Sequence, residues 1–234
     1  MPQLLRSYKI SVQYGTQIRA NPVSTVLPST RRNTMNGFGA VAEASDLIVE
    51  RLREETDSRG DVTTVEPSNI VLASPDDVTG NGNVRLSVFP YKISHEPRHG
   101  SPGRIQTQAN TFKNPPLLLS CYYLVTAYPG SATDASAKVQ DQQIALGLAM
   151  QILHDNAQFE TEHLQGESSA VEAFQVALHS DSNDEIERIW DTFVDVPLHP
   201  SVVYEASPIP IESTTEERVT RVSERDLDLH DRRK

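Results

Sequence analysis

Two histidines and a glutamate are the side chains best suited to metal chemistry in this sequence. His95 and His99 lie four residues apart with Glu96 between them, inside residues 94–115, which are rich in His, Pro, Gly, Gln and Asn. Zinc sites use imidazole and carboxylate ligands, but they need three or four protein ligands. Nothing close by in the sequence completes the set. We therefore expect no metal site and no other cofactor.

Adjacent carboxylates at Asp76 and Asp77 are a second candidate, since paired acids serve in general acid–base catalysis. They follow Ser74 and Pro75, a context in which turn formation is the better interpretation. The sequence also lacks a phosphate-binding Gly-rich loop and a G-x-S-x-G nucleophile motif. We predict no catalytic residues and no enzymatic activity. One alternative stays open, a small acidic cytosolic enzyme whose active site lies in residues 94–115.

The elements that would position such groups centre on an apolar run at residues 117–127, opened by a proline pair and closed by Pro-Gly. A run bounded in this way is typical of a buried strand. The single cysteine, Cys121, lies in it and is expected to be a small buried side chain, so no disulfide forms within the chain. Tyr122 and Tyr123 must point to opposite faces of the strand. We expect one of them to be exposed and able to anchor an interface.

A helix is predicted after this strand. It begins near Asp134 or Ser136, either of which can cap it, and runs to about His154. Its central residues, IALGLAMQIL, are apolar nearly all round. This pattern predicts a helix packed deep inside the domain.

Hydrophobic spacing predicts the remaining elements. Pro90 indicates an edge position or a bulge in one strand, and Pro208 interrupts the closing strand. The element order indicates an α+β fold: a single domain with a mostly antiparallel or mixed sheet and about three helices packed on one face. We expect helices at 41–53 and 186–193, and Trp190 lies in the buried stripe of the second helix. The strands are expected at 70–72, 84–93, 174–178, 202–204 and 209–211.

Composition divides the chain into three parts. Residues 1–34 are unlike the rest, and Met35 is followed at once by a helix pattern, so residues 1–34 are expected to be a disordered arm or an incorrectly assigned start. Residues 35–212 form the α+β domain, and residues 213–234 are expected to be a charged, mobile tail. Mass spectrometry of the native N-terminus tests the start, since peptides from residues 7–19 would exclude initiation at Met35.

The distribution of charge along the chain limits the classes of partner that it can bind. The whole chain carries −11 and residues 1–34 carry +5, so the remainder carries −16, which repels nucleic-acid phosphates and anionic lipid. Acidic residues are abundant and lysine is scarce, which favours a halophilic source. No run approaches the roughly 20 apolar residues of a membrane span, and no secretory signal is evident. We expect synthesis in the cytoplasm, no nucleic-acid partner and no membrane span.

Six segments, taken together, resemble a known family. They read AVAEASDLIVERL, VRLSVFPYKI, PPLLLSCYYLVTAY, ALGLAMQILHDN, EIERIWDTF and SVVYEASPIPIES, within roughly residues 35–213. The pattern is similar to the N-terminal-domain family of tail-terminator, or cap, proteins of extracellular contractile injection systems. These are the phage-tail-like particles typified by the Photorhabdus virulence cassettes and the antifeeding prophage.

The resemblance implies a structural role without turnover. Such proteins form a ring, expected to be a homohexamer, on the last layer of inner tube and against the top of the sheath. The ring ends growth of tube and sheath and anchors the sheath, within a particle that can be released from the cell. The partners implied are other copies of the chain, the inner tube protein and the sheath protein. The alternative within this class is a phage-type tail-completion or neck protein.

Partner contacts are expected in residues 94–115, in the tail from residue 213 and along the edge of the strand that contains Pro90. The candidate contact residues are His95, Arg98, His99, Arg104, Tyr122, Arg218, Arg221 and Arg225.

Overall fold

Strand β5 (Leu117–Ala127) lies at the centre of the main sheet, with the bounds that the sequence predicted. The computed structural model describes residues 37–60, 65–78, 82–95, 103–108, 110–130, 133–160, 173–179 and 183–218. From Leu119 to Ala127 every residue of β5 is buried, because the strand is covered on both faces. The prediction for residues 1–34 lies outside the described residues.

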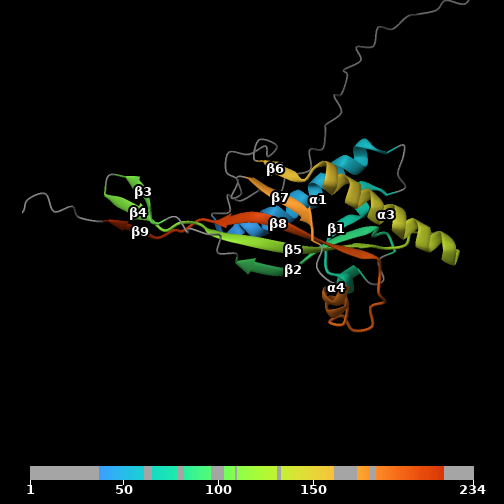
Figure 1. Ribbon diagram of the computed structural model, residues 1–234. Coiled ribbons are helices and arrows are strands. Elements are labelled where there is room, and N and C mark those ends of the chain that lie inside the picture. The colour runs from blue at the N-terminus through green and yellow to red at the C-terminus, as the bar shows by residue number, and fades with distance from the viewer. Residues whose placement is uncertain are drawn as a thin grey trace, which may run out of the picture. The chain divides into compact units, whose positions relative to one another are not determined.

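Six strands form the main sheet, in the order β1-β2-β5-β8-β7-β6 (Figure 1). The strand β1 (Ile70–Leu72) runs parallel to β2 (Leu86–His95), and the other neighbours are antiparallel. The α+β class with a mixed, mostly antiparallel sheet is therefore confirmed. The remaining strands are β6 (Gln158–Glu160), β7 (Ala173–Leu178) and β8 (Ser201–Ile211).

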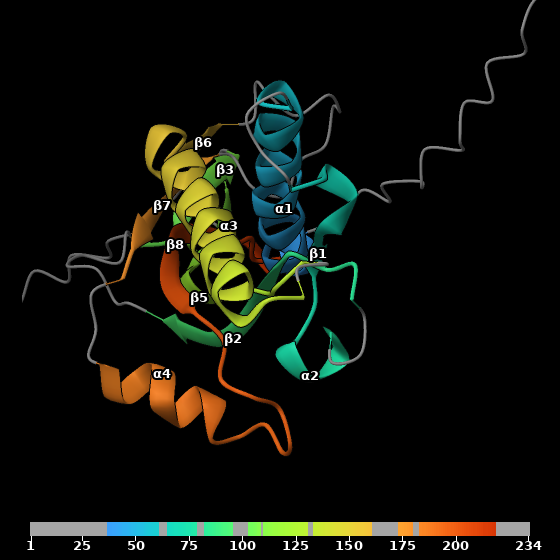
Figure 2. The ribbon, with the colours of Figure 1, turned by 90° about the vertical axis from the view of Figure 1, so that its right-hand side faces the viewer.

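Two helices, α1 (Ala40–Ser58) and α3 (Ala135–Asp155), cover one face of this sheet (Figure 2). Their apolar residues enclose the main core with the inward residues of β2, β5, β7 and β8. Each fully buried side chain of this size contributes about 2 kcal/mol of hydrophobic stabilisation. The largest of them include Ile48, Leu52, Tyr123, Ile152 and Leu153.

The helix α4 (Asn183–Trp190) covers the opposite face, so the prediction that all helices share one face is wrong. Ile189 and Trp190 pack there against Tyr122 and Leu124 of β5. The physical reason is that β5 is apolar on both sides: its odd residues, such as Tyr123, face α1 and α3, and its even residues need a second cover.

The position of α3 differs from the prediction of a deeply packed helix. Only five of its residues are buried, Gln142, Ala145, Ala149, Ile152 and Leu153. The other side of the helix is exposed although much of it is apolar. The predicted cap is confirmed, since the Asp134 carboxylate accepts a hydrogen bond of 3.0 Å from the backbone N–H of Ala137.

Residues expected to form a loop and a tail contain a second sheet of three strands, in the order β3-β4-β9. The loop prediction for residues 94–115 is wrong where β2 continues to His95 and where β3 (Ile105–Gln108) and β4 (Thr111–Lys113) form an antiparallel pair. The strand β9 (Glu216–Arg218) pairs with β4 in a region expected to be mobile. These strands are mostly polar and short, so hydrophobic alternation does not reveal them.

Several predictions for single turns and strands can be compared directly with the structure. Strand β2 shifts register between Pro90 and Lys92, which confirms the irregularity expected at this proline. Strand β8 continues through Pro208 and Pro210, so the predicted break is wrong. The expected turn at Asp76 and Asp77 is one helical turn, α2 (Pro75–Val78). Short 3-10 turns occupy Gly37–Gly39 and Pro67–Asn69.

Candidate functional site

Within the described residues, the side chains that the sequence analysis considered for metal binding or catalysis do not assemble into a reactive set. Asp76 and Asp77 are exposed, and the Ser74 hydroxyl donates a hydrogen bond to Asp76. His95 is exposed at the end of β2, while Glu96 and His99 lie outside the described residues. Among the residues that are described, no three His, Cys, Asp or Glu side chains gather where they could hold a metal ion.

The single thiol is equally unsuited to nucleophilic chemistry. Cys121 is fully buried in the main core. Burial raises the pKa of its thiol from 9.0 to about 11, because the thiolate would lose its hydration. A protonated, inaccessible sulfur is a packing group rather than a nucleophile.

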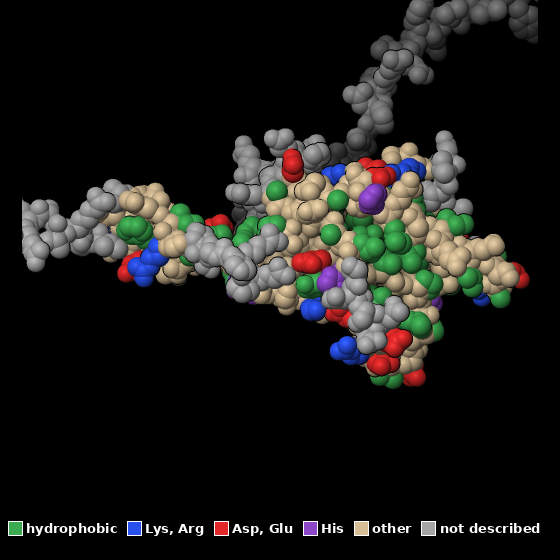
Figure 3. Space-filling view, in the orientation of Figure 1, with side chains coloured by type: hydrophobic (Ala, Val, Ile, Leu, Met, Phe, Trp, Pro, Cys, Tyr) green, Lys and Arg blue, Asp and Glu red, His purple; other side chains and the backbone are tan. Residues whose placement is uncertain are grey.

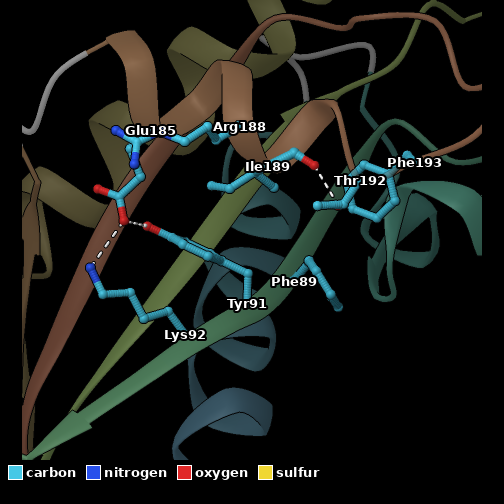
Figure 4. A pocket seen from close by; sticks show the side chains of 8 residues that line it. All are labelled: Phe89, Tyr91, Lys92, Glu185, Arg188, Ile189, Thr192 and Phe193. Carbon is cyan, nitrogen blue, oxygen red and sulfur yellow. Dashed lines mark hydrogen bonds and ion pairs between the residues drawn. The ribbon is translucent and has the colours of Figure 1, made fainter.

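A cleft lies between β2 and α4 (Figure 4). It has a volume of about 740 Å³. Strand β2 contributes residues on both sides of its register shift, and α4 with the turn that follows it forms the opposite wall. The lining residues are Phe89, Tyr91, Lys92, Glu185, Arg188, Ile189, Thr192 and Phe193.

One end of the cleft carries an ionic cluster centred on Glu185. Its carboxylate accepts hydrogen bonds from the Lys92 ammonium at 3.0 Å and from the Tyr91 hydroxyl at 3.2 Å. The Lys92 ammonium also lies 4.5 Å from the centre of the Tyr122 ring, within cation–π range. His179 places one ring nitrogen 3.8 Å from Glu185. These contacts tie β2 to α4 at this end.

The other end of the cleft is aromatic. The ring centres of Phe89 and Phe193 are 6.1 Å apart in an edge-to-face arrangement, and Trp190 contacts Phe193 at 5.7 Å. Edge-to-face pairs of this kind hold ring positions more firmly than burial alone. A cleft with a fixed aromatic wall and an ionic end is suited to binding a side chain or a peptide.

The outer edge of β2 runs along this cleft. Strand β1 pairs only with Leu86–Val88, so beyond Val88 no described strand lies on that side of β2. Pro90 has no N–H to donate, so it contributes no main-chain donor to this edge. Strand addition uses such an edge for main-chain bonds and an adjacent pocket for side chains.

Four of the predicted contact residues lie within the described part of the chain, His95, Arg104, Tyr122 and Arg218, and none of these four lines the cleft. Tyr122 is only 7% exposed and Tyr123 is fully buried, so the expectation that one of them is exposed is wrong. The reason is α4, which covers the face to which Tyr122 points. Arg104 and Arg218 are exposed at the three-stranded sheet, where Arg104 pairs with Glu217 at 2.7 Å. Arg98, His99, Arg221 and Arg225 lie outside the described residues.

Sequence reasoning did not identify the cleft residues, although it placed most of them on the correct elements. The helical stripe that contains Ile189 and Phe193 indicates burial, but it carries no sign that Glu185 and Arg188 beside it face a strand edge. No helix within the described residues is both long enough and apolar enough to cross a membrane.

Comparison with known proteins gives a family and two distant structural likenesses. No curated protein matches the chain. One similar solved structure is the sheath/tube terminator of an extracellular contractile injection system, PVC, in its extended state. It has 16% identity and a TM-score of 0.41, over 69% of this chain and 57% of that one. Another is the tube-terminating cap of the anti-feeding prophage, with 16% identity and a TM-score of 0.42, over 68% of this chain and 55% of that one.

This chain therefore spans little more than half the length of each of those two proteins. The family comparison is more extensive, because the model of the Pvc16 N-terminal domain matches residues 43–225, from α1 through β9. The match confirms the family resemblance seen in the six sequence segments. The chain belongs to the Pvc16 N-terminal domain family.

Proposed function

We propose that this protein is a tail terminator: a structural component that caps the inner tube and sheath of a contractile injection particle. It ends their growth and anchors the sheath, and it performs no chemical turnover. It assembles as a ring, expected to be a homohexamer. The inner tube and sheath proteins are its partners, and nucleic acid is not. It is made in the cytoplasm and becomes part of a particle that can be released from the cell.

The observation that carries this proposal is the family match over residues 43–225. That range includes both sheets and the β2–α4 cleft, so the match extends to the surfaces available for contact and not only to the core. The described residues also support a binding role, since the cleft offers a strand edge, an aromatic wall and an ionic end rather than a nucleophile beside a base.

Purification from the native host tests the proposal. The chain carries an affinity tag at its C-terminus, the lysate stays at the salt concentration of the host, and the eluate goes to mass spectrometry and negative-stain imaging with a label on the tag. We expect tube and sheath proteins in the eluate and label at one end of rod-shaped particles. An untagged strain treated identically controls for particles that bind the resin. A second strain tagged at the N-terminus controls for a tag that blocks docking.

Label along the whole rod, or co-purification of metabolic enzymes or nucleic acid instead of tube and sheath, would contradict the terminator role. The enzyme alternative is tested by replacing His95 and His99 with alanine. A terminator should still enter particles in normal amounts, whereas an enzyme that uses these residues would lose turnover.

A further inference from the structure

The outward face of α3 has an unusual surface for a chain with this much charge. Its exposed residues between the ends of the helix are Val139, Gln140, Gln143, Ile144, Gly147 and Gln151, and none of them carries a charge. Val139 is 51% exposed and Ile144 is 57% exposed. The one charged residue in this interval is Asp141, which is turned toward the body of the domain and neutralised by Arg85 at 2.7 Å.

Both ends of the helix, by contrast, carry charged residues. Lys138 lies at its beginning, and Asp155 lies at its end, where Arg59 is 3.7 Å away. Figure 3 shows tan and green surface over α3 between these charged ends. Charged residues make up 23% of the sequence, so a stretch of exposed helix without any is a feature that needs a cause. Depletion of charge is the compositional mark of an interface core.

Gly147 lies at the middle of this uncharged face. A Cβ placed on it would meet nothing within 4 Å, so no packing among the described residues requires glycine at this position. Glycine in the interior of a helix is less favourable than alanine. The residues three and four positions away are Gln143, Ile144, Met150 and Gln151, which share its face, and all but Met150 are exposed. A glycine surrounded in this way allows another backbone to approach the helix closely.

We propose that the uncharged face of α3 is a contact surface between copies of this chain. The inference rests on the proposed function, which requires each copy to contact a neighbour. Two copies that each carry −11 repel one another. A surface without acidic groups lets two copies approach with the least repulsion, and the outward face of α3 is such a surface. In a ring the contact is heterologous, so the face meets a different surface of the next copy.

The test is self-association of the purified full chain, measured by sedimentation velocity over a range of protein and KCl concentrations. Ile144→Lys places a charge in the uncharged face and should weaken association at least tenfold. Val194→Lys is the matched control, since Val194 is 83% exposed but lies outside α3. It should associate like the wild type. Fluorescence of Trp190 and circular dichroism establish that each variant is folded.

A second variant distinguishes a loss of self-association from a loss of folding stability. Gly147→Leu fills space that is open within the chain and replaces a poor helix former with a good one. The variant should be at least as stable as the wild type and yet associate at least tenfold more weakly.

Wild-type association in both α3 variants would overturn the inference, and so would a wild-type chain that stays monomeric at every concentration and salt. The proposed function is judged separately by the particle purification. Labelled particle ends together with normal association of both α3 variants would reject the contact surface alone. Association that depends on α3 without recovery of tube and sheath would reject the terminator role alone.

Discussion

Arg85 and Asp141 form an ion pair that links the start of β2 to α3. The side chains are 2.7 Å apart and only 8% and 19% exposed. The Asp141 carboxylate also accepts a hydrogen bond of 2.8 Å from the backbone N–H of Gly130. A Cβ at Gly130 would lie 2.5 Å from the Arg85 guanidinium and 2.6 Å from the Asp141 carboxylate, so any other residue here would displace the ion pair.

We predict that Asp141→Ala destabilises the protein by about 3 kcal/mol, because it leaves a buried guanidinium without its counter-charge. Urea denaturation measures the free energy of unfolding. Asp155→Ala is the control on the same helix. Its pair with Arg59 is longer, at 3.7 Å, and its side chain is 49% exposed, so its loss should cost less than about 1 kcal/mol. Equal effects of the two substitutions would contradict this account.

Cys121 should be unreactive in the folded protein. Its pKa of about 11 leaves a thiolate fraction on the order of one in a thousand at pH 8, and its side chain is inaccessible. A thiol reagent at pH 8 should label it slowly in buffer and completely in denaturing urea. Because the folded pKa lies above the ordinary value of 9.0, the stability linked to this group is full below pH 9 and falls as the pH rises toward 11. Rapid labelling in buffer would show that the core opens readily.

At the scale of elements, the beginning of α3 is capped by the side chain of Asp134. Asp134 caps the helix through the 3.0 Å bond to Ala137. Asp134→Ala should lower the free energy of unfolding by about 1 kcal/mol, while Asp134→Asn keeps an acceptor oxygen and should change it little. The measurement is thermal unfolding of the two variants beside the wild type. A similar loss in both variants would mean that charge at the helix beginning matters more than the hydrogen bond.

The strand β2 combines two features that bear on partner binding. Among the described strands, only β1 lies on its outer side, from Leu86 to Val88. The register shift and Pro90 then interrupt the ladder, as natural edge strands often do to prevent unwanted pairing.

At the scale of the whole molecule, net charge should control both folding and assembly. The chain carries −11 in total. Screening extends over roughly 30 Å at 0.01 M salt and about 3 Å at 1 M. We predict unfolding in low salt and stability in molar KCl, with self-association that strengthens as salt increases. Thermal melts and sedimentation across this range measure both. Sucrose at matched concentration is the control for general exclusion effects. Indifference to KCl would argue against a halophilic source.

Local patterns in the sequence determined much of this protein. The bounds of β5, the cap at Asp134 and the buried stripe with Trp190 all follow from residues a few positions apart, where periodicity and capping chemistry act. The family match confirmed a resemblance that was also visible in the sequence alone. Of the predicted contact residues, the four that the structure describes, His95, Arg104, Tyr122 and Arg218, do not line the β2–α4 cleft.

Tertiary structure alone decided which surfaces are covered. Periodicity shows that Tyr122 lies on an apolar face, but it cannot show that α4 buries that face, or that the apolar outer side of α3 stays exposed. The cleft likewise depends on Lys92 meeting Glu185, which is 93 residues away in the chain. Contacts at such separations arise from the packing of whole elements, and single-sequence spacing carries no information about which elements meet.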